Sequence, residues 1–173
     1  MSLCSVSSKP TKKMTARIDV QFACKDDGAP GSNDISNWVN RTIIAVGRGS
    51  EHEVSVRVVD ASEMQALNRD FRHEDAPTNV LSFPAGEIDG LPVDVARRLG
   101  DVVVCASIVR DEAQQQGKSC GAHWAHMVVH GTLHLLGFDH EKDDAALEME
   151  GLETAILADL GIANPYGESP QET

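Results

Sequence analysis

The chain lacks the features that mark membrane, secreted or disulfide-rich proteins. No apolar run approaches the ~20 residues that a membrane-spanning helix requires, and the N-terminal segment has no apolar stretch typical of a signal peptide. Its cysteines lie far apart, at Cys4, Cys24, Cys105 and Cys120, and none forms a C-x-x-C pair. That spacing argues against a disulfide framework and against a thiolate zinc site. We therefore expect a protein of the reducing cytoplasm.

Basic residues are scarce. The chain has 15 lysines and arginines against 27 aspartates and glutamates, which gives a formal net charge of −12. The excess is uneven, because residues 141–173 hold nine acids and one base whereas residues 1–13 hold three lysines and no acid. An acidic protein attracts nucleic acid poorly. Any nucleic-acid function must therefore depend on a local basic groove or on a partner.

The chain does contain a dense histidine motif, H-G-T-L-H-L-L-G-F-D-H, at residues 130–140. His130 and His134 are four residues apart, so they project from the same face of a helix. Gly137 tolerates a positive φ and suits the end of that helix, which lets the chain return His140 as a third ligand. Three imidazoles leave one coordination position open, as a catalytic zinc ion requires for water.

The motif lacks one residue of the zinc peptidases that it otherwise matches. In the H-E-x-x-H-x-x-G-x-x-H pattern, the glutamate after the first histidine acts as the general base. Gly131 occupies that position here. The spacing thus favours a hydrolytic metal centre, and the glycine argues against ordinary peptidase chemistry.

The segment 121–136 is apolar on nearly every side apart from a stripe of histidines, which predicts a buried helix. Buried imidazoles need partners. We interpret His123 and His126 in this stripe as residues that pack or orient a ligand, because a single histidine is more often structural. Asp139, beside the third histidine, has three possible roles: it orients a histidine, caps the turn, or acts as the general base.

The remaining patterns predict one domain over residues 15–166, between disordered segments at 1–14 and 167–173. We expect strands at 17–22, 53–60, 78–83 and 101–106, and helices at 34–46, from an N-cap at Ser62 to Phe71, at 107–116, at 121–136 and at 143–160. Residues 85–99, which include Arg97 and Arg98, are predicted to form a loop. The last helix is predicted to bury Leu147, Leu152, Ile156 and Leu160 and to turn its acidic residues toward solvent. This order predicts an α/β fold with a small mixed sheet of about four strands around a central histidine-bearing helix.

Residues 130–140 closely resemble the H-G-x-L-H-L-x-G-Y-D-H signature of the YbeY family. Three further segments are similar to the same family: A-H-W-A-H-M-V-V at 122–129, P-T-N-V-L-S-F-P at 77–84 and G-D-V-V-V-C at 100–105. The resemblance covers roughly residues 16–166. Phe138 departs from the usual tyrosine, and Asn79 stands where many members have aspartate.

The resemblance implies a metal-dependent endoribonuclease that acts on rRNA. It implies one zinc ion held by His130, His134 and His140 in a cleft beside the sheet, and a catalytic arginine after the second helix, which falls on Arg72. From its charged loop alone, Arg72 would be read as a solvated residue. The implied substrate is single-stranded RNA, in 16S rRNA 3′-end maturation and ribosome quality control in the cytoplasm. Ribosomal proteins are the implied partners, with no membrane and no DNA.

Two other functions fit parts of the sequence. A non-enzymatic ribosome-biogenesis factor with a structural metal agrees with the acidic charge. A zinc peptidase agrees with the ligand spacing but not with Gly131. In the nuclease interpretation, a zinc-activated water attacks the phosphodiester while Arg72 stabilises the developing charge.

Overall fold

The computed structural model describes residues 16–47, 52–85 and 97–167. The segments predicted to be disordered, 1–14 and 167–173, lie outside these ranges apart from Gly167. Within the described ranges, no helix is both long enough and apolar enough to cross a membrane.

The described residues form nine elements in the order predicted from the sequence. The strands are β1 (Arg17–Phe22), β2 (His52–Val59), β3 (Val80–Pro84) and β4 (Arg97–Cys105). The helices are α1 (Ser32–Ala45), α2 (Ala61–Arg72), α3 (Ala106–Gln115), α4 (Cys120–Leu135) and α5 (Asp143–Asp159). The α/β class and the helix-strand order are confirmed.

The four strands form one mixed sheet in the order β1-β2-β4-β3. β1, β2 and β4 are parallel, and β3 runs antiparallel to β4 at the edge. The alternating valines Val54, Val56 and Val58 of β2 are all buried against α1 and α4. A valine-rich strand is what a sheet covered by helices requires.

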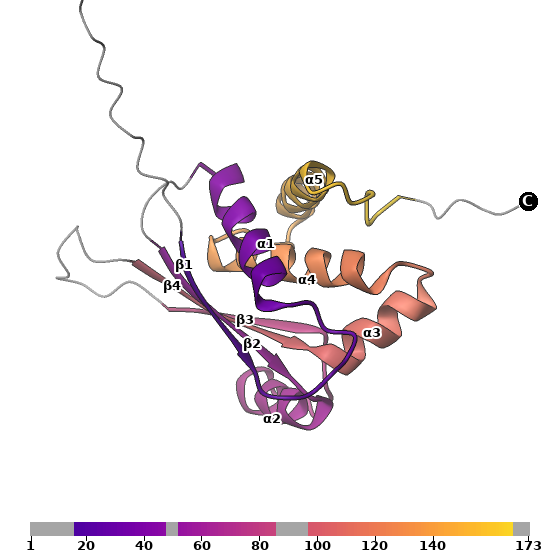
Figure 1. Ribbon diagram of the computed structural model, residues 1–173. Coiled ribbons are helices and arrows are strands. Elements are labelled where there is room, and N and C mark those ends of the chain that lie inside the picture. Colours follow the sequence, from indigo (N-terminus) through magenta and orange to yellow (C-terminus); the bar gives the residue numbers. More distant parts are fainter. Residues whose placement is uncertain (1–15, 48–51, 86–96, 168–173) are drawn as a thin grey trace, which may run out of the picture.

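Helices cover the two faces of the sheet unequally (Figure 1). α1 and α4 lie on one face with α5 outside them, and α2 lies on the other. β4 serves both sides, because Val102 and Val104 belong to the core with α1 and α4 whereas Val103 and Cys105 pack with Met64 of α2. Eleven of the sixteen residues of α4 are buried, which confirms the histidine helix as the central one.

The start of α2 differs from the prediction. Its N-cap is Asp60 rather than Ser62, and the Asp60 carboxylate accepts a hydrogen bond of 2.8 Å from the backbone N–H of Glu63. Aspartate and serine are both good N-caps.

The predicted loop at 85–99 is also too long. β4 already begins at Arg97, and its pairing with β2 shifts register at Glu53, so that Leu99 has no partner residue in β2. Gly100 follows with φ +136°, and a Cβ there would lie 2.1 Å from the carbonyl oxygen of Phe83. The glycine that reads as a loop signal therefore permits a bulge inside a strand. Residues 86–96 lie outside the described ranges.

α5 is turned differently from its predicted orientation. Leu147, predicted to face inward, is 69% exposed, whereas Glu153, predicted to face solvent, is fully buried. Ile156 is buried as predicted, and Leu152 and Leu160 are partly buried. The cause is a set of hydrogen-bond donors that Glu153 meets on α4.

Candidate metal centre

The last two turns of α4 and the turn that follows the helix bring three histidines together. His130 and His134 stand one helical turn apart, and their Nε2 atoms are 3.1 Å from each other. Gly137 then takes φ +96° and turns the chain, which carries His140 to a ring-centroid distance of 5.0 Å from His134. The candidate ligand atoms of the three side chains all lie within 4.8 Å of one another. The structure thus unites the three predicted ligands.

This geometry suits a metal ion. Two ligands that bind one tetrahedral zinc at ~2.0–2.1 Å are separated by about 3.3 Å, close to the 3.1 Å between the two Nε2 atoms. Burial, together with His130 and His140 nearby, lowers the pKa of His134 to about 4. The imidazole is therefore neutral at pH 7 with a lone pair to offer. His140 is exposed, so the cluster is open to solvent on one side.

Gly131 faces the sheet. A Cβ on this residue would lie 2.7 Å from Cγ1 of Val102 and 3.2 Å from Oγ of Ser82. The Ser82 hydroxyl in turn donates a hydrogen bond of 2.8 Å to the carbonyl of Gly131. A glutamate does not fit here unless β3 and β4 move away, so helix–sheet contact explains the departure from the peptidase pattern.

Asp139 shapes the turn. Its Oδ1 atom accepts hydrogen bonds from the backbone N–H groups of His140, at 2.7 Å, and Glu141, at 3.3 Å. Such bonds are the usual way in which aspartate stabilises a turn. Of its three predicted roles, these contacts favour the turn.

Sequence reasoning missed Glu153 of α5, which lies behind the histidines. Its Oε1 atom is 2.6 Å from Nδ1 of His130, its Oε2 atom is 2.7 Å from Nε2 of His126, and the hydroxyl of Tyr166 donates to Oε2. Burial alone would raise the pKa of Glu153, but these three hydrogen bonds outweigh it and hold the pKa at about 2. The carboxylate is thus charged. No spacing within α5 singles it out, because its partners lie on α4 and in the segment after α5.

The two other histidines of α4 have different partners. His126 bonds to Glu153 and so contacts the residue that holds His130. His123 instead lies 2.7 Å from the carboxylate of Glu112 in α3, and burial lowers its pKa. The Asn79 amide also donates to Glu112, at 3.2 Å, so an aspartate at position 79 would face a like charge.

Phe138 lies in the turn between the ligands. Its ring is partly buried both against the core between the sheet, α1 and α4 and against the core between α4 and α5. Its backbone forms a hydrogen bond with His134. The phenyl ring needs no hydroxyl for these contacts, so the departure from tyrosine leaves the ligands in place.

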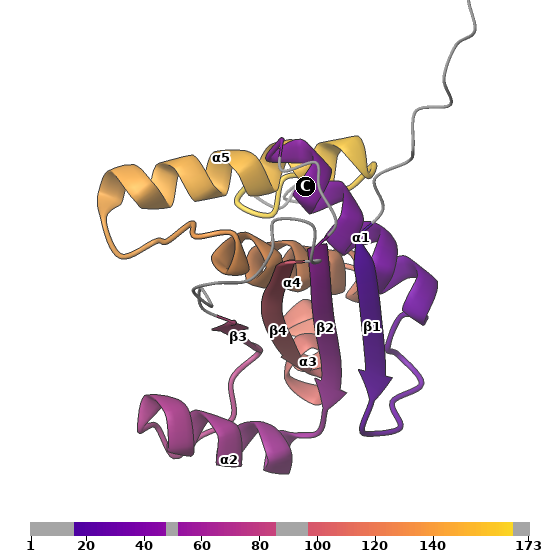
Figure 2. The same cartoon turned by 90° about the vertical axis from the view of Figure 1, so that its left-hand side faces the viewer.

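Arg72 is not part of the histidine cluster. It is the exposed last residue of α2, on the opposite face of the sheet from α4, and His73 ends the helix with φ +60°. In Figure 2, α2 runs outward past the edge strand β3, and the connection from α4 to α5 lies on that same side. α2, which Arg72 ends, and the connection from α4 to α5, which contains His140, thus lie toward one edge of the sheet on its opposite faces.

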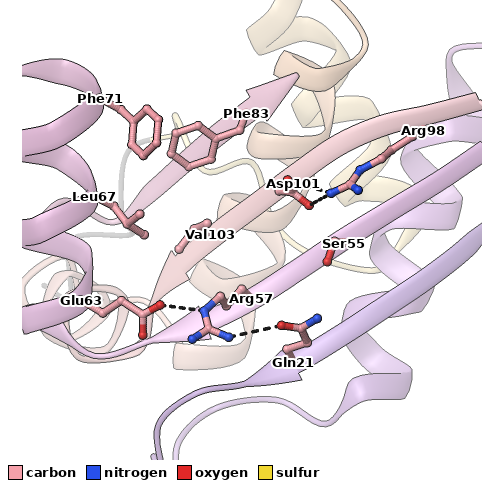
Figure 3. Close-up of a pocket in the computed structure, with 10 residues that line it drawn as sticks. All are labelled: Gln21, Ser55, Arg57, Glu63, Leu67, Phe71, Phe83, Arg98, Asp101 and Val103. Carbon is pink, nitrogen blue, oxygen red and sulfur yellow. Dashed lines mark hydrogen bonds and ion pairs between the residues drawn. The ribbon is translucent and has the colours of Figure 1, made fainter. Parts of the chain in front are cut away.

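A separate pocket of about 510 Å³ lies on the α2 face (Figure 3). Its arginines are paired, Arg57 with Glu63 at 2.7 Å and Arg98 with Asp101 at 2.8 Å. Arg69 likewise lies against Asp70 and Asp75. These pairs neutralise the positive charge that a basic groove would need.

Comparisons with known proteins identify the family of this chain. A family model described as Endoribonuclease YbeY matches residues 21–161, which include Arg72 and the three histidines. The Endoribonuclease YbeY of Alcanivorax borkumensis is 47% identical over 160 residues, 92% of this chain and 91% of that protein. The solution structure of TM1509 from Thermotoga maritima has a TM-score of 0.55 at 27% identity, and the match covers 90% of this chain and 99% of that one.

Proposed function

The chain belongs to the YbeY family of endoribonucleases, and we propose that it is a zinc-dependent enzyme that cleaves single-stranded RNA during rRNA processing. The observation that carries the proposal is the convergence of His130, His134 and His140, with two Nε2 atoms 3.1 Å apart. A family model alone identifies a class of reaction. The three histidines would supply the metal site at which such a reaction takes place.

The three imidazoles would hold one zinc ion in the space between them. When bound, zinc supplies Lewis acidity and activates water at the coordination position that the protein leaves open. The protein keeps His134 neutral through burial and holds His130 through a hydrogen bond to Glu153. The exposed His140 marks the side from which a phosphodiester would reach the centre.

Arg72 would supply positive charge to the transition state. Its guanidinium is planar and permanently charged, and thus suited to a phosphorane-like oxyanion. Two facts support the role: the edge strand β3 is the next element after α2, and Ser82 of β3 is hydrogen-bonded to Gly131 of α4, next to the first ligand. RNA bound across this edge would reach both residues.

The substrate in the cell would be rRNA, in 16S 3′-end maturation and ribosome quality control in the cytoplasm, and not DNA. The net charge of −12 and the paired arginines on the α2 face give the protein little general attraction for RNA. A ribosomal protein that positions the rRNA would compensate. The free thiols of Cys24, Cys105 and Cys120 agree with a reducing compartment.

The test is cleavage of a single-stranded RNA by protein of measured metal content, beside His134→Ala and Arg72→Ala. We expect cleavage to follow zinc content, to be lost in His134→Ala and to fall about 10²–10³-fold in Arg72→Ala, while both variants stay folded. DNA of the same sequence and unstructured casein should remain intact, and cut casein would favour the peptidase. Equal cleavage by all three proteins would reveal a contaminating ribonuclease and overturn the proposal in favour of a non-enzymatic ribosome factor.

A further inference from the structure

The carboxylate of Glu153 receives hydrogen bonds from two parts of the chain. Two donors, His126 and His130, come from α4, and the third is the hydroxyl of Tyr166 in the segment that follows α5. Glu153 is fully buried. A buried charge persists only when hydrogen bonds compensate for the lost water. Three donors on two oxygens meet that demand and fix the side chain in one position.

We propose that Glu153 is a positioning residue for the metal ligand His130, and that Tyr166 holds Glu153 in that position. The inference rests on the proposed metal binding and adds two residues to it. A neutral imidazole carries its proton on one nitrogen and its lone pair on the other. Because an ionised carboxylate only accepts, its bond to Nδ1 keeps the proton there and leaves the Nε2 lone pair towards His134.

The distances distinguish this role from a second metal site. The ligand atoms of His126, His130 and Glu153 also lie within 4.8 Å of one another. Their nitrogen–oxygen separations are 2.7 and 2.6 Å, however. These values match charge-assisted hydrogen bonds and are shorter than the about 3.3 Å between two ligands of one zinc ion. Hydrogen bonds thus account for the group without a second ion.

Tyr166 is held by its own surroundings. Its backbone N–H donates to the Asn164 side chain at 2.9 Å, and Lys118 donates to the carbonyl of Pro165 at 2.8 Å. The bond from Lys118 ties the segment after α5 to the residues just before α4 begins. The hydroxyl then reaches both Glu153 and, at 3.3 Å, Nε2 of His126. The segment after α5 is thus two hydrogen bonds away from a metal ligand.

The experiment compares Glu153→Gln and Tyr166→Phe with the matched control Glu148→Gln, which removes the same charge from an exposed position on α5. Zinc affinity is measured by competition with a chromophoric chelator, on full-length protein shown to be folded by circular dichroism. Loss of an outer hydrogen-bond partner typically weakens metal binding about 10–100-fold. We expect that loss for Glu153→Gln, a few-fold loss for Tyr166→Phe, and wild-type affinity for Glu148→Gln.

A second readout separates positioning from general stability. Nitrogen NMR of the histidine side chains reports which ring nitrogen of His130 carries the proton, and we expect that preference to weaken in Glu153→Gln. Wild-type affinity and tautomer in Glu153→Gln would overturn the proposal. If Glu153→Gln does not fold, wild-type zinc affinity in Tyr166→Phe overturns the part of the proposal that concerns Tyr166. Absence of zinc binding by the wild-type protein would instead remove the proposed metal function on which the inference rests.

Discussion

Two glutamates, one on each side of the sheet, show how burial changes what a carboxylate does. Glu63 on α2 pairs with Arg57 at 2.7 Å, but both side chains are more than a third exposed. Glu153 on α5 is fully buried and accepts three hydrogen bonds. Water competes with the first pair and cannot reach the second. Similar distances therefore describe a solvated surface in one case and a fixed geometry in the other.

The helices on these two sides differ in the same way. α4 lies so close to the sheet that Gly131 leaves no room for a Cβ, whereas α2 leaves beside it a pocket of about 510 Å³ (Figure 3). The tightly packed side carries the predicted ligands. The looser side carries paired surface charges. Substitutions on the two sides should therefore differ in kind as well as in size.

The largest effect is expected for His134→Ala. Losing one of three ligands should cost more than the roughly 100-fold that loss of an outer partner costs, so metal content and RNA cleavage should both fall to background. Elemental analysis and a cleavage assay measure the two quantities. Arg57→Ala on the opposite face is the control and should retain both. Equal losses of metal and cleavage in the two variants would show that the two faces of the sheet do not differ in their importance for the metal centre.

Arg72→Ala should come next. If the guanidinium stabilises the transition state, its loss should lower the cleavage rate about 10²–10³-fold without changing metal content. Arg69→Ala, one turn earlier on α2 and paired with carboxylates, is the matched control and should cleave normally. If both arginine variants cleave at the wild-type rate, the α2 face takes no part in catalysis.

Gly131→Ala tests the close contact of α4. The new methyl group would meet Val102 at 2.7 Å, so overpacking should lower the free energy of unfolding by about 1–3 kcal/mol. Gly151→Ala in α5 meets nothing within 4 Å and should instead stabilise by up to about 1 kcal/mol, because alanine favours a helix over glycine. Urea unfolding measures both. A higher free energy of unfolding for Gly131→Ala would show that the sheet shifts to make room for the methyl group.

The smallest effect is expected for the ion pair of Arg57 and Glu63. A double-mutant cycle on unfolding free energies should give a coupling of about 0.2–1 kcal/mol that shrinks as salt is added. Coupling well above that range, and insensitive to salt, would mean that the α2 face is shielded from water and that the two carboxylates differ less than their exposure indicates.

Local patterns predicted much of this molecule. His130 and His134 follow from one helical turn, His140 from the glycine turn, and the central position of α4 from its apolar surface. Glu153 could not be predicted in this way. Its burial depends on donors that lie 23 and 27 positions away along the chain, and no pattern within α5 reveals them.

The start of β4 was predicted wrongly for a related reason, although the strand over 101–105 was predicted correctly. Gly100 is typical of a loop, and its neighbours Arg97 and Arg98 are polar, but pairing with β2 draws all three into the sheet. The placement of Arg72 depends in the same way on how α2 crosses the edge of the sheet. The sequence alone gives the parts of the candidate site, whereas contacts between distant segments decide their orientation.

The third histidine has a mechanical consequence as well as a chemical one. His130 and His134 belong to α4, but His140 lies in the connection to α5, after the turn at Gly137. An ion bound by all three would hold that connection against the end of α4. Residues 136–142 should then resist protease in the loaded protein and become cleavable when a chelator removes the ion, since ligands stabilise the state that binds them.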